Sequence, residues 1–125
     1  MIKTIYTLGA GNKKKLLQYD WSPSGACLVL QREKPKIDCC FFLVALYHFS
    51  GQTVEGGFSQ TTPALGGFGK WVEVASKRFN SRNLTSRHGS FMAAILCEQF
   101  GVESSLKGNS VMLTFPTNTR PATQK

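Results

Sequence analysis

The sequence predicts a small α+β domain, in which an antiparallel sheet carries two consecutive helices on one face. Its first part holds short segments rich in β-branched and aromatic residues, separated by turn sequences. Residues 68–100 then follow the three-to-four-residue apolar period of amphipathic helices. A last β-rich segment, residues 110–115, ends at a proline. Strands followed by helices and a further strand are typical of an α+β fold.

The length of 125 residues suits one domain. We expect residues 1–116 to form a single α+β domain. Residues 117–125 have no apolar periodicity, and we expect them to be a frayed C-terminal tail.

Four strands are expected in the N-terminal part, at residues 2–8, 16–21, 26–32 and 37–49, and a C-terminal strand at 110–115 completes the sheet. The segment Ile37–Phe49 differs from the others because both of its alternating faces are apolar. Such a strand is usually covered on both sides. We therefore expect a homodimer in which a second copy covers part of this strand and the helices. The alternative is a helical layer on one face and a loop on the other.

The first helix is expected to begin at Phe68 and to run to about Phe79. The second is expected from about Ser86 to Phe100, with Thr85 or Ser86 as its N-cap and Gly101 at its C-terminal end. The segment that leads into the first helix, residues 51–69, carries six glycines, which favours a mobile loop with a short strand near Thr53.

The chain carries 15 basic and 7 acidic residues, a net charge of +8, which favours an anionic partner. No secretory signal is evident at the N-terminus, and the longest apolar run is far shorter than the roughly 20 residues of a membrane helix. The four cysteines show neither zinc-ligand spacing nor a disulfide pattern, so reduced thiols are expected. We expect a cytoplasmic protein that does not contact a membrane.

The junction between the two helices is the most informative stretch. From Lys70 to His88 there are five basic residues and one acid, Glu73. Several of these cations lie just before or within the first turn of the second helix, where free N–H groups and the helix dipole already favour an anion. Cations at this position are unfavourable next to the positive end of the helix dipole, and a bound phosphate would offset that repulsion. The predicted ligand-binding residues are Phe68, Lys70, Arg78, Phe79, Asn80, Arg82, Asn83, Arg87 and His88.

Within this set, we expect Arg82 and Arg87 to hold the phosphate, with help from Asn83, and an aromatic ring to stack on a base. The alternative is that both arginines are solvated or pair with Glu73 and Glu103. Two other turns are basic, Lys13–Lys15 and Arg32–Lys36, and the sequence does not indicate whether they join this site.

No catalytic apparatus is recognisable. The acids show no metal-binding pattern, the two histidines lie in no nucleophile arrangement, and the glycine-rich stretch before the first helix lacks the spacing of a phosphate-binding loop. We expect no enzyme activity, no cofactor and no metal.

These observations favour a non-catalytic protein that binds a small free or cyclic nucleotide, for sequestration or sensing. Two alternatives remain: a single-stranded nucleic-acid-binding protein, and a small basic inhibitor that docks on an acidic protein surface. In size and element order the chain resembles small phage proteins that sequester cyclic-nucleotide immune signals, a resemblance carried by no specific residue.

Overall fold

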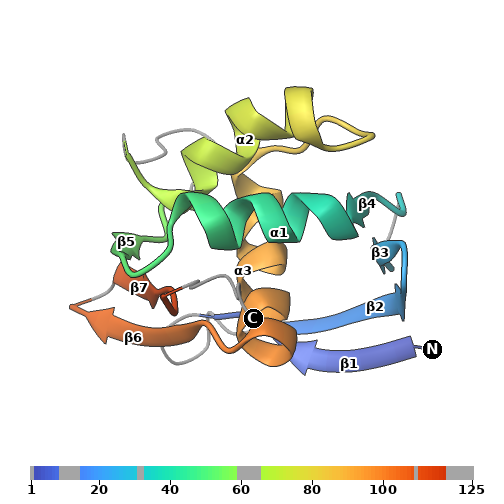
Figure 1. The fold of residues 1–125 in the computed structure, drawn as a ribbon. Helices are drawn as coiled ribbons and strands as arrows, with labels where there is room; N and C mark the ends of the chain where they lie inside the picture. Colours follow the sequence, from blue (N-terminus) through green and yellow to red (C-terminus); the bar gives the residue numbers. More distant parts are fainter. Residues whose placement is uncertain (1, 9–14, 31–32, 59–65, 109, 118–125) are drawn as a thin grey trace, which may run out of the picture.

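The computed structural model describes residues 2–8, 15–30, 33–58, 66–108 and 110–117. They form two antiparallel sheets and three helices, which confirms the α+β class (Figure 1). The predicted tail lies outside the described residues, except for Thr117. The elements are β1 (Ile2–Tyr6), β2 (Leu16–Ser22), β3 (Gly25–Leu28), β4 (Lys36–Asp38), α1 (Cys39–His48), β5 (Thr53–Glu55), α2 (Phe68–Phe79), α3 (Ser86–Phe100), β6 (Glu103–Lys107) and β7 (Ser110–Thr114).

The first sheet has the order β1-β2-β3-β4, with every neighbour antiparallel. It confirms three of the predicted N-terminal strands, with β3 shorter than expected. Leu17 and Tyr19 alternate inward along β2, and Ala26 and Ile37 face each other across β3 and β4, all of them buried. This pattern gives the sheet one apolar face, which contacts helices α1 and α3.

The prediction of a strand over Ile37–Phe49 was wrong. Of the residues in this segment, only Ile37 and Asp38 belong to strand β4, and residues 39–48 form helix α1. The segment is apolar at nearly every position, so it satisfies the two-residue period of a strand and the helical period equally well. Helix α1 buries Phe41, Phe42 and Ala45, which lie on one side of a helix.

The C-terminal strand was also misplaced, because it lies outside the first sheet. Strand β7 is the centre of a second sheet with the order β5-β7-β6. Strand β5 confirms the short strand expected near Thr53, whereas β6 was not predicted. All five residues of β6 are exposed, so the strand has no buried alternate face to produce an apolar alternation.

Helices α2 and α3 have the bounds that were predicted. Thr85 and His88 form a capping box at the start of α3, and Gly101 ends it with a φ of 78°. The two helices approach closely at a pair of glycines: a Cβ at Gly89 would lie 3.1 Å from the Cα of Gly69. In Figure 1, α3 passes behind α1, with the first sheet on one side and the second on the other.

The loop between α2 and α3 is tied to strand β4 by Asn80. Its side-chain oxygen accepts the backbone N–H of Asp38 at 2.7 Å, and its amide nitrogen donates to the carbonyl of Lys36 at 2.9 Å. In return, the carboxylate of Asp38 accepts the backbone N–H and the hydroxyl of Ser81. We call these contacts the Asn80–Asp38 cluster. The cluster holds β4, and with it the residues that precede β4, beside the loop that leads into α3.

We predict that Asn80→Ala lowers the free energy of unfolding by about 1–3 kcal/mol, because the part-buried N–H of Asp38 loses its acceptor. Chemical denaturation of both proteins measures this loss. The matched control is Asn83→Ala in the same loop, an exposed position where a change within about 0.5 kcal/mol is expected. Equal effects of the two substitutions would contradict this role for Asn80.

Candidate functional site

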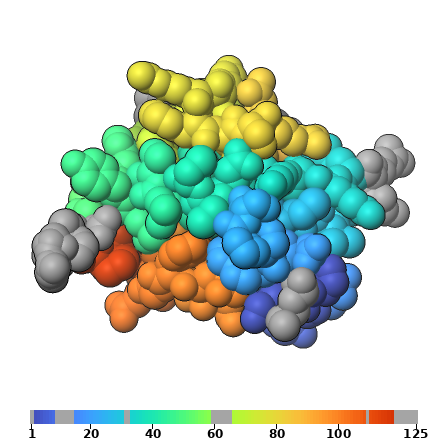
Figure 2. Space-filling model, turned by 45° about the vertical axis from the view of Figure 1, so that its right-hand side comes forward, coloured from blue at the N-terminus to red at the C-terminus, as the bar shows by residue number. Residues whose placement is uncertain are grey.

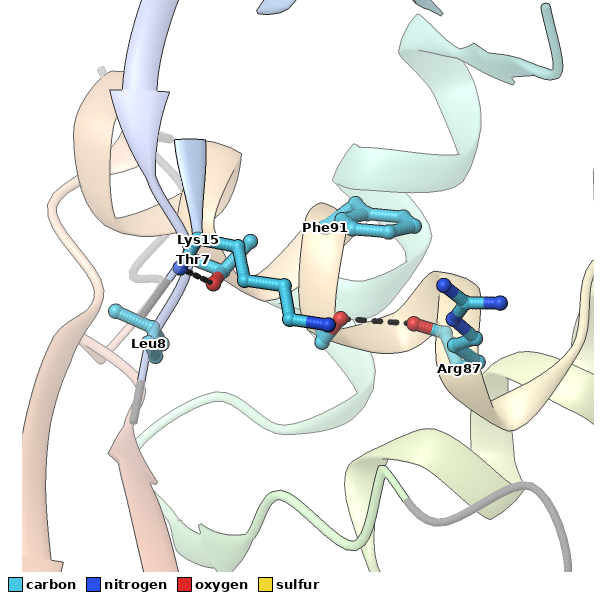
Figure 3. A pocket seen from close by; sticks show the side chains of 6 residues that line it. Thr7, Leu8, Lys15, Arg87 and Phe91 are labelled. Carbon is cyan, nitrogen blue, oxygen red and sulfur yellow. Dashed lines mark hydrogen bonds between the residues drawn. The ribbon is translucent and has the colours of Figure 1, made fainter. Parts of the chain in front are cut away.

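A cleft of about 160 Å³ lies where the end of β1 and the start of β2 meet the first turns of α3 (Figure 3). The residues that line it are Thr7, Leu8, Lys15, Arg87, Ser90 and Phe91. We call it the α3 cleft. The Lys15 side chain reaches from the sheet towards α3, which contributes Arg87 and Phe91 to the opposite side.

Local hydrogen bonds hold both sides of the α3 cleft. The backbone N–H of Thr7 donates to the carbonyl of Lys15 at 2.8 Å, and the N–H of Lys15 donates to the hydroxyl of Thr7 at 2.9 Å. On the helix, the hydroxyl of Ser90 donates to the carbonyl of Arg87 at 2.8 Å. Lys15 therefore leaves the sheet from a fixed backbone position, opposite a regular helical turn.

The charge of the α3 cleft is positive. Lys15 and Arg87 supply two cations from different elements, and none of the six described lining residues is an acid. The hydroxyl of Thr7 accepts from the N–H of Lys15 and keeps its own proton to donate to an anion, whereas the hydroxyl of Ser90 already donates to the carbonyl of Arg87. An arginine can hold phosphate through two parallel hydrogen bonds, and a lysine adds a point charge. Chemically, this arrangement can bind a phosphate or carboxylate group.

Arg82 and His88, which were also predicted to bind the anion, have a partner within the chain. Glu33, which comes shortly before β4, reaches back to the junction. Its carboxylate accepts from the guanidinium of Arg82 at 2.9 Å and lies 3.0 Å from Nε2 of His88. Thus Arg82 pairs with an acid of the chain, but with Glu33 and not with Glu73 or Glu103. The carboxylate of Glu33 thus occupies the position beside Arg82 and His88 where the sequence predicted a bound phosphate.

The ring of His88 closes the start of α3. Its Nδ1 accepts the backbone N–H of Thr85 at 3.1 Å, so Nε2 carries the proton and donates to Glu33. Burial lowers the pKa of His88 below its ordinary value of 6.5, although Glu33 opposes this shift. The hydrogen bond from His88, followed by the charge of Arg82, lowers the pKa of Glu33.

The remaining predicted site residues are dispersed. Phe68 is fully buried in the core and offers no face to a base. Asn80 is used by the cluster described above. Arg78 lies over the ring of its neighbour Phe79, 5.4 Å from the centroid, and Asn83 is exposed. Lys70 lies at the start of α2, 3.9 Å from Glu73.

Both basic turns contribute to the surroundings of α3. Lys15 lines the α3 cleft, and the turn before β4 supplies Glu33. Lys13, Lys14 and Arg32 lie outside the described residues. Sequence reasoning missed Thr7, Ser90, Phe91 and Glu33. None of the four carried a usable signal: Phe91 fits the apolar period of α3, and only the structure shows that it is half-buried while its neighbour Met92 is buried.

The comparisons with known proteins give no match. No protein-family model, no curated protein and no solved structure is significantly similar to the chain. Among the described residues, no helix has the length and apolarity needed to cross a membrane. In the same part of the chain, no group of three or more His, Cys, Asp or Glu residues is placed to hold a metal ion.

We predict that acidification destabilises the protein through His88. Between its lowered pKa in the folded protein and its ordinary value of 6.5, the unfolded chain binds a proton that the folded chain does not. Stability is therefore full above that window and falls as the pH decreases through it. In His88→Gln, the amide can accept from Thr85 and donate to Glu33, but it does not titrate.

Denaturant unfolding at pH values from about 7.5 to about 5 measures the effect. The wild-type protein should lose more stability over this range than His88→Gln. Glu33 contributes only at lower pH, because its lowered pKa lies below the ordinary range of a carboxyl group. Identical pH slopes for the two proteins would show that His88 does not contribute.

Proposed function

We propose that this chain is a non-catalytic binding protein for a nucleotide-type phosphate ligand, which it sequesters or senses. The observation that supports the proposal is the α3 cleft, which Lys15 and Arg87 line from different parts of the chain, with no acid among the described lining residues. The site differs from the one expected from sequence. Arg87 remains, Lys15 replaces Arg82 as the second cation, and the first-turn N–H of His88 is used by the N-cap residue Thr85.

The size of the α3 cleft supports a small ligand that is only partly enclosed. Its volume of about 160 Å³ is below the roughly 300–1,000 Å³ of sites that enclose a drug-sized molecule. The cleft therefore suits a phosphate group and the atoms next to it. A base attached to that phosphate would lie at the rim, where the half-buried ring of Phe91 offers an aromatic surface.

Titration calorimetry with inorganic phosphate, adenosine monophosphate and cyclic adenosine monophosphate tests the proposal. We predict that Arg87→Ala weakens binding by roughly ten- to 150-fold, the scale of a hydrogen bond to a charged group. Arg87→Lys should also weaken it, because the bidentate contact is lost. Arg87 is exposed, so the thermal stability of both variants should stay close to that of the wild type.

The matched control is Arg78→Ala, which removes an exposed arginine from α2 and should leave affinity unchanged. Binding of none of the three probes, or wild-type affinity in Arg87→Ala, would contradict the proposal. A single-stranded oligonucleotide that binds more tightly than the mononucleotides, with a steep salt dependence, would favour the nucleic-acid alternative.

We further propose that the chain forms a homodimer through the outer surface of α1. Leu43 and Tyr47 lie one helical turn apart and are 53% and 77% exposed, with exposed Cys40 on the same stripe. Residues 39–47 carry no charge, so this face avoids the repulsion expected between two copies with a net charge of +8. In Figure 2, α1 crosses the middle of the visible face.

Sedimentation velocity at micromolar concentration tests the homodimer. We predict a dimer for the wild type and a monomer for Leu43→Glu, because two buried carboxylates would face each other across a two-fold axis. The control is Leu106→Glu on β6, a similarly exposed leucine outside α1, which should leave the dimer intact. A wild-type monomer would rule out this interface.

A further inference from the structure

A second cleft, of about 220 Å³, lies between the C-terminal end of α1 and the first turns of α2. Within the part of the chain that the structure describes, it shares no lining residue with the α3 cleft. We call it the α2 cleft. The residues that line it are His48, Phe49, Gly66, Gly67, Lys70, Trp71 and Val74.

One wall of the α2 cleft is aromatic and held rigidly. The indole of Trp71 stacks on Phe41 at 5.2 Å between centroids and on His48 at 5.4 Å, and it meets Phe49 edge-on at 5.2 Å. Trp71 is nevertheless only half-buried, and His48 is exposed. The cleft thus presents parts of fixed rings to solvent, and such rings favour a flat aromatic partner in an offset-stacked or edge-to-face arrangement.

The polar end of the α2 cleft is positive. Lys70 lies in the first turn of α2, and it is the one residue with a fixed charge among the seven described lining residues. The N-cap of α2 is Gly67, which has no side chain to cap the helix, and the first turn contains no acid. The contact of Lys70 with Glu73 is loose, at 3.9 Å. The ammonium group and the start of the helix therefore both favour an anionic group at this end.

We propose that the α2 cleft binds a planar aromatic carboxylate, with its ring against Trp71 and His48 and its acid group at Lys70. The cleft is smaller than sites for drug-sized ligands, which limits the ligand to about one ring system. A carboxylate attached directly to a ring can lie in the ring plane, so a single flat ligand can meet both the aromatic wall and the cation. This proposal does not depend on the function proposed for the α3 cleft.

The experiment follows the indole N–H signal of Trp71 in the ¹⁵N-labelled protein during titration with three probes. Benzoate has the ring and the charge, benzamide has the ring without the charge, and cyclohexanecarboxylate has the charge without the aromatic ring. The expected result is a saturable shift of the Trp71 signal, with benzoate bound roughly fivefold or more tightly than either other probe. The Arg87 and Phe91 amide signals, which report on the α3 cleft, should move little.

Two substitutions test whether the acid group of benzoate binds next to Lys70. Lys70→Met keeps most of the apolar stem and should bring benzoate down to the affinity of benzamide. Val74→Glu places an acid at the exposed rim and should weaken benzoate without affecting the fold. The control Lys77→Met removes an exposed lysine elsewhere on α2 and should behave as the wild type. The proposal is overturned by a non-saturable Trp71 shift, by equal affinities for the three probes, or by unchanged benzoate binding in both cleft variants.

Discussion

The side chain of Asn80 joins two parts of the chain that lie more than forty positions apart in the sequence. One amide group accepts from the backbone of Asp38 and donates to the carbonyl of Lys36, while Asp38 holds the next residue of the loop, Ser81. This exchange places the short strand β4 beside the junction of α2 and α3. Helix α1 follows β4 directly, and Asp38 is its N-cap residue. An amide can serve a strand backbone in this way because it carries an acceptor and two donors in one plane.

The charge distribution around α3 follows from that placement. Because β4 lies beside the junction, Glu33 reaches Arg82 and His88 and supplies the negative charge that the start of a helix favours. Arg87 projects on another side, where Lys15 approaches from the first sheet. Among the described residues, Arg82 is thus paired with Glu33 within the chain, whereas Lys15 and Arg87 face a cleft without an acid. This separation is the physical basis for proposing that Lys15 and Arg87 bind the ligand.

Local patterns predicted the helices of this fold well. The periods of α2 and α3, the Thr85 cap and the terminal Gly101 are encoded by neighbouring residues, so their bounds could be predicted from the sequence. The segment of α1 could not, because a run that is apolar on all sides fits a buried strand and a buried helix alike. Strand β6 could not be predicted because it has no apolar alternation. The division into two sheets could not be predicted either, because it depends on contacts between distant segments.

The difference between local patterns and contacts of distant segments also explains which residues of the candidate site could be predicted. Arg87 was predicted because its position in a first helical turn is a local property. The contributions of Lys15 and Glu33 were not, since each depends on which turn of the sheet meets α3. Asn80 was expected to bind a ligand, but its amide is occupied by backbone groups that no local pattern reveals. Phe68 fits the helical period of α2, and the structure shows that this period places it in the core.

The central claim is that Lys15 and Arg87 hold one phosphate group together, and a double-mutant cycle on adenosine monophosphate affinity tests it most directly. Affinities are measured for the wild type, Lys15→Ala, Arg87→Ala and the double variant. If both cations contact the same group, the loss in the double variant should differ from the sum of the two single losses by about 0.5–3 kcal/mol. Losses that add within about 0.5 kcal/mol, or a Lys15 variant that binds as the wild type does, would contradict the shared site.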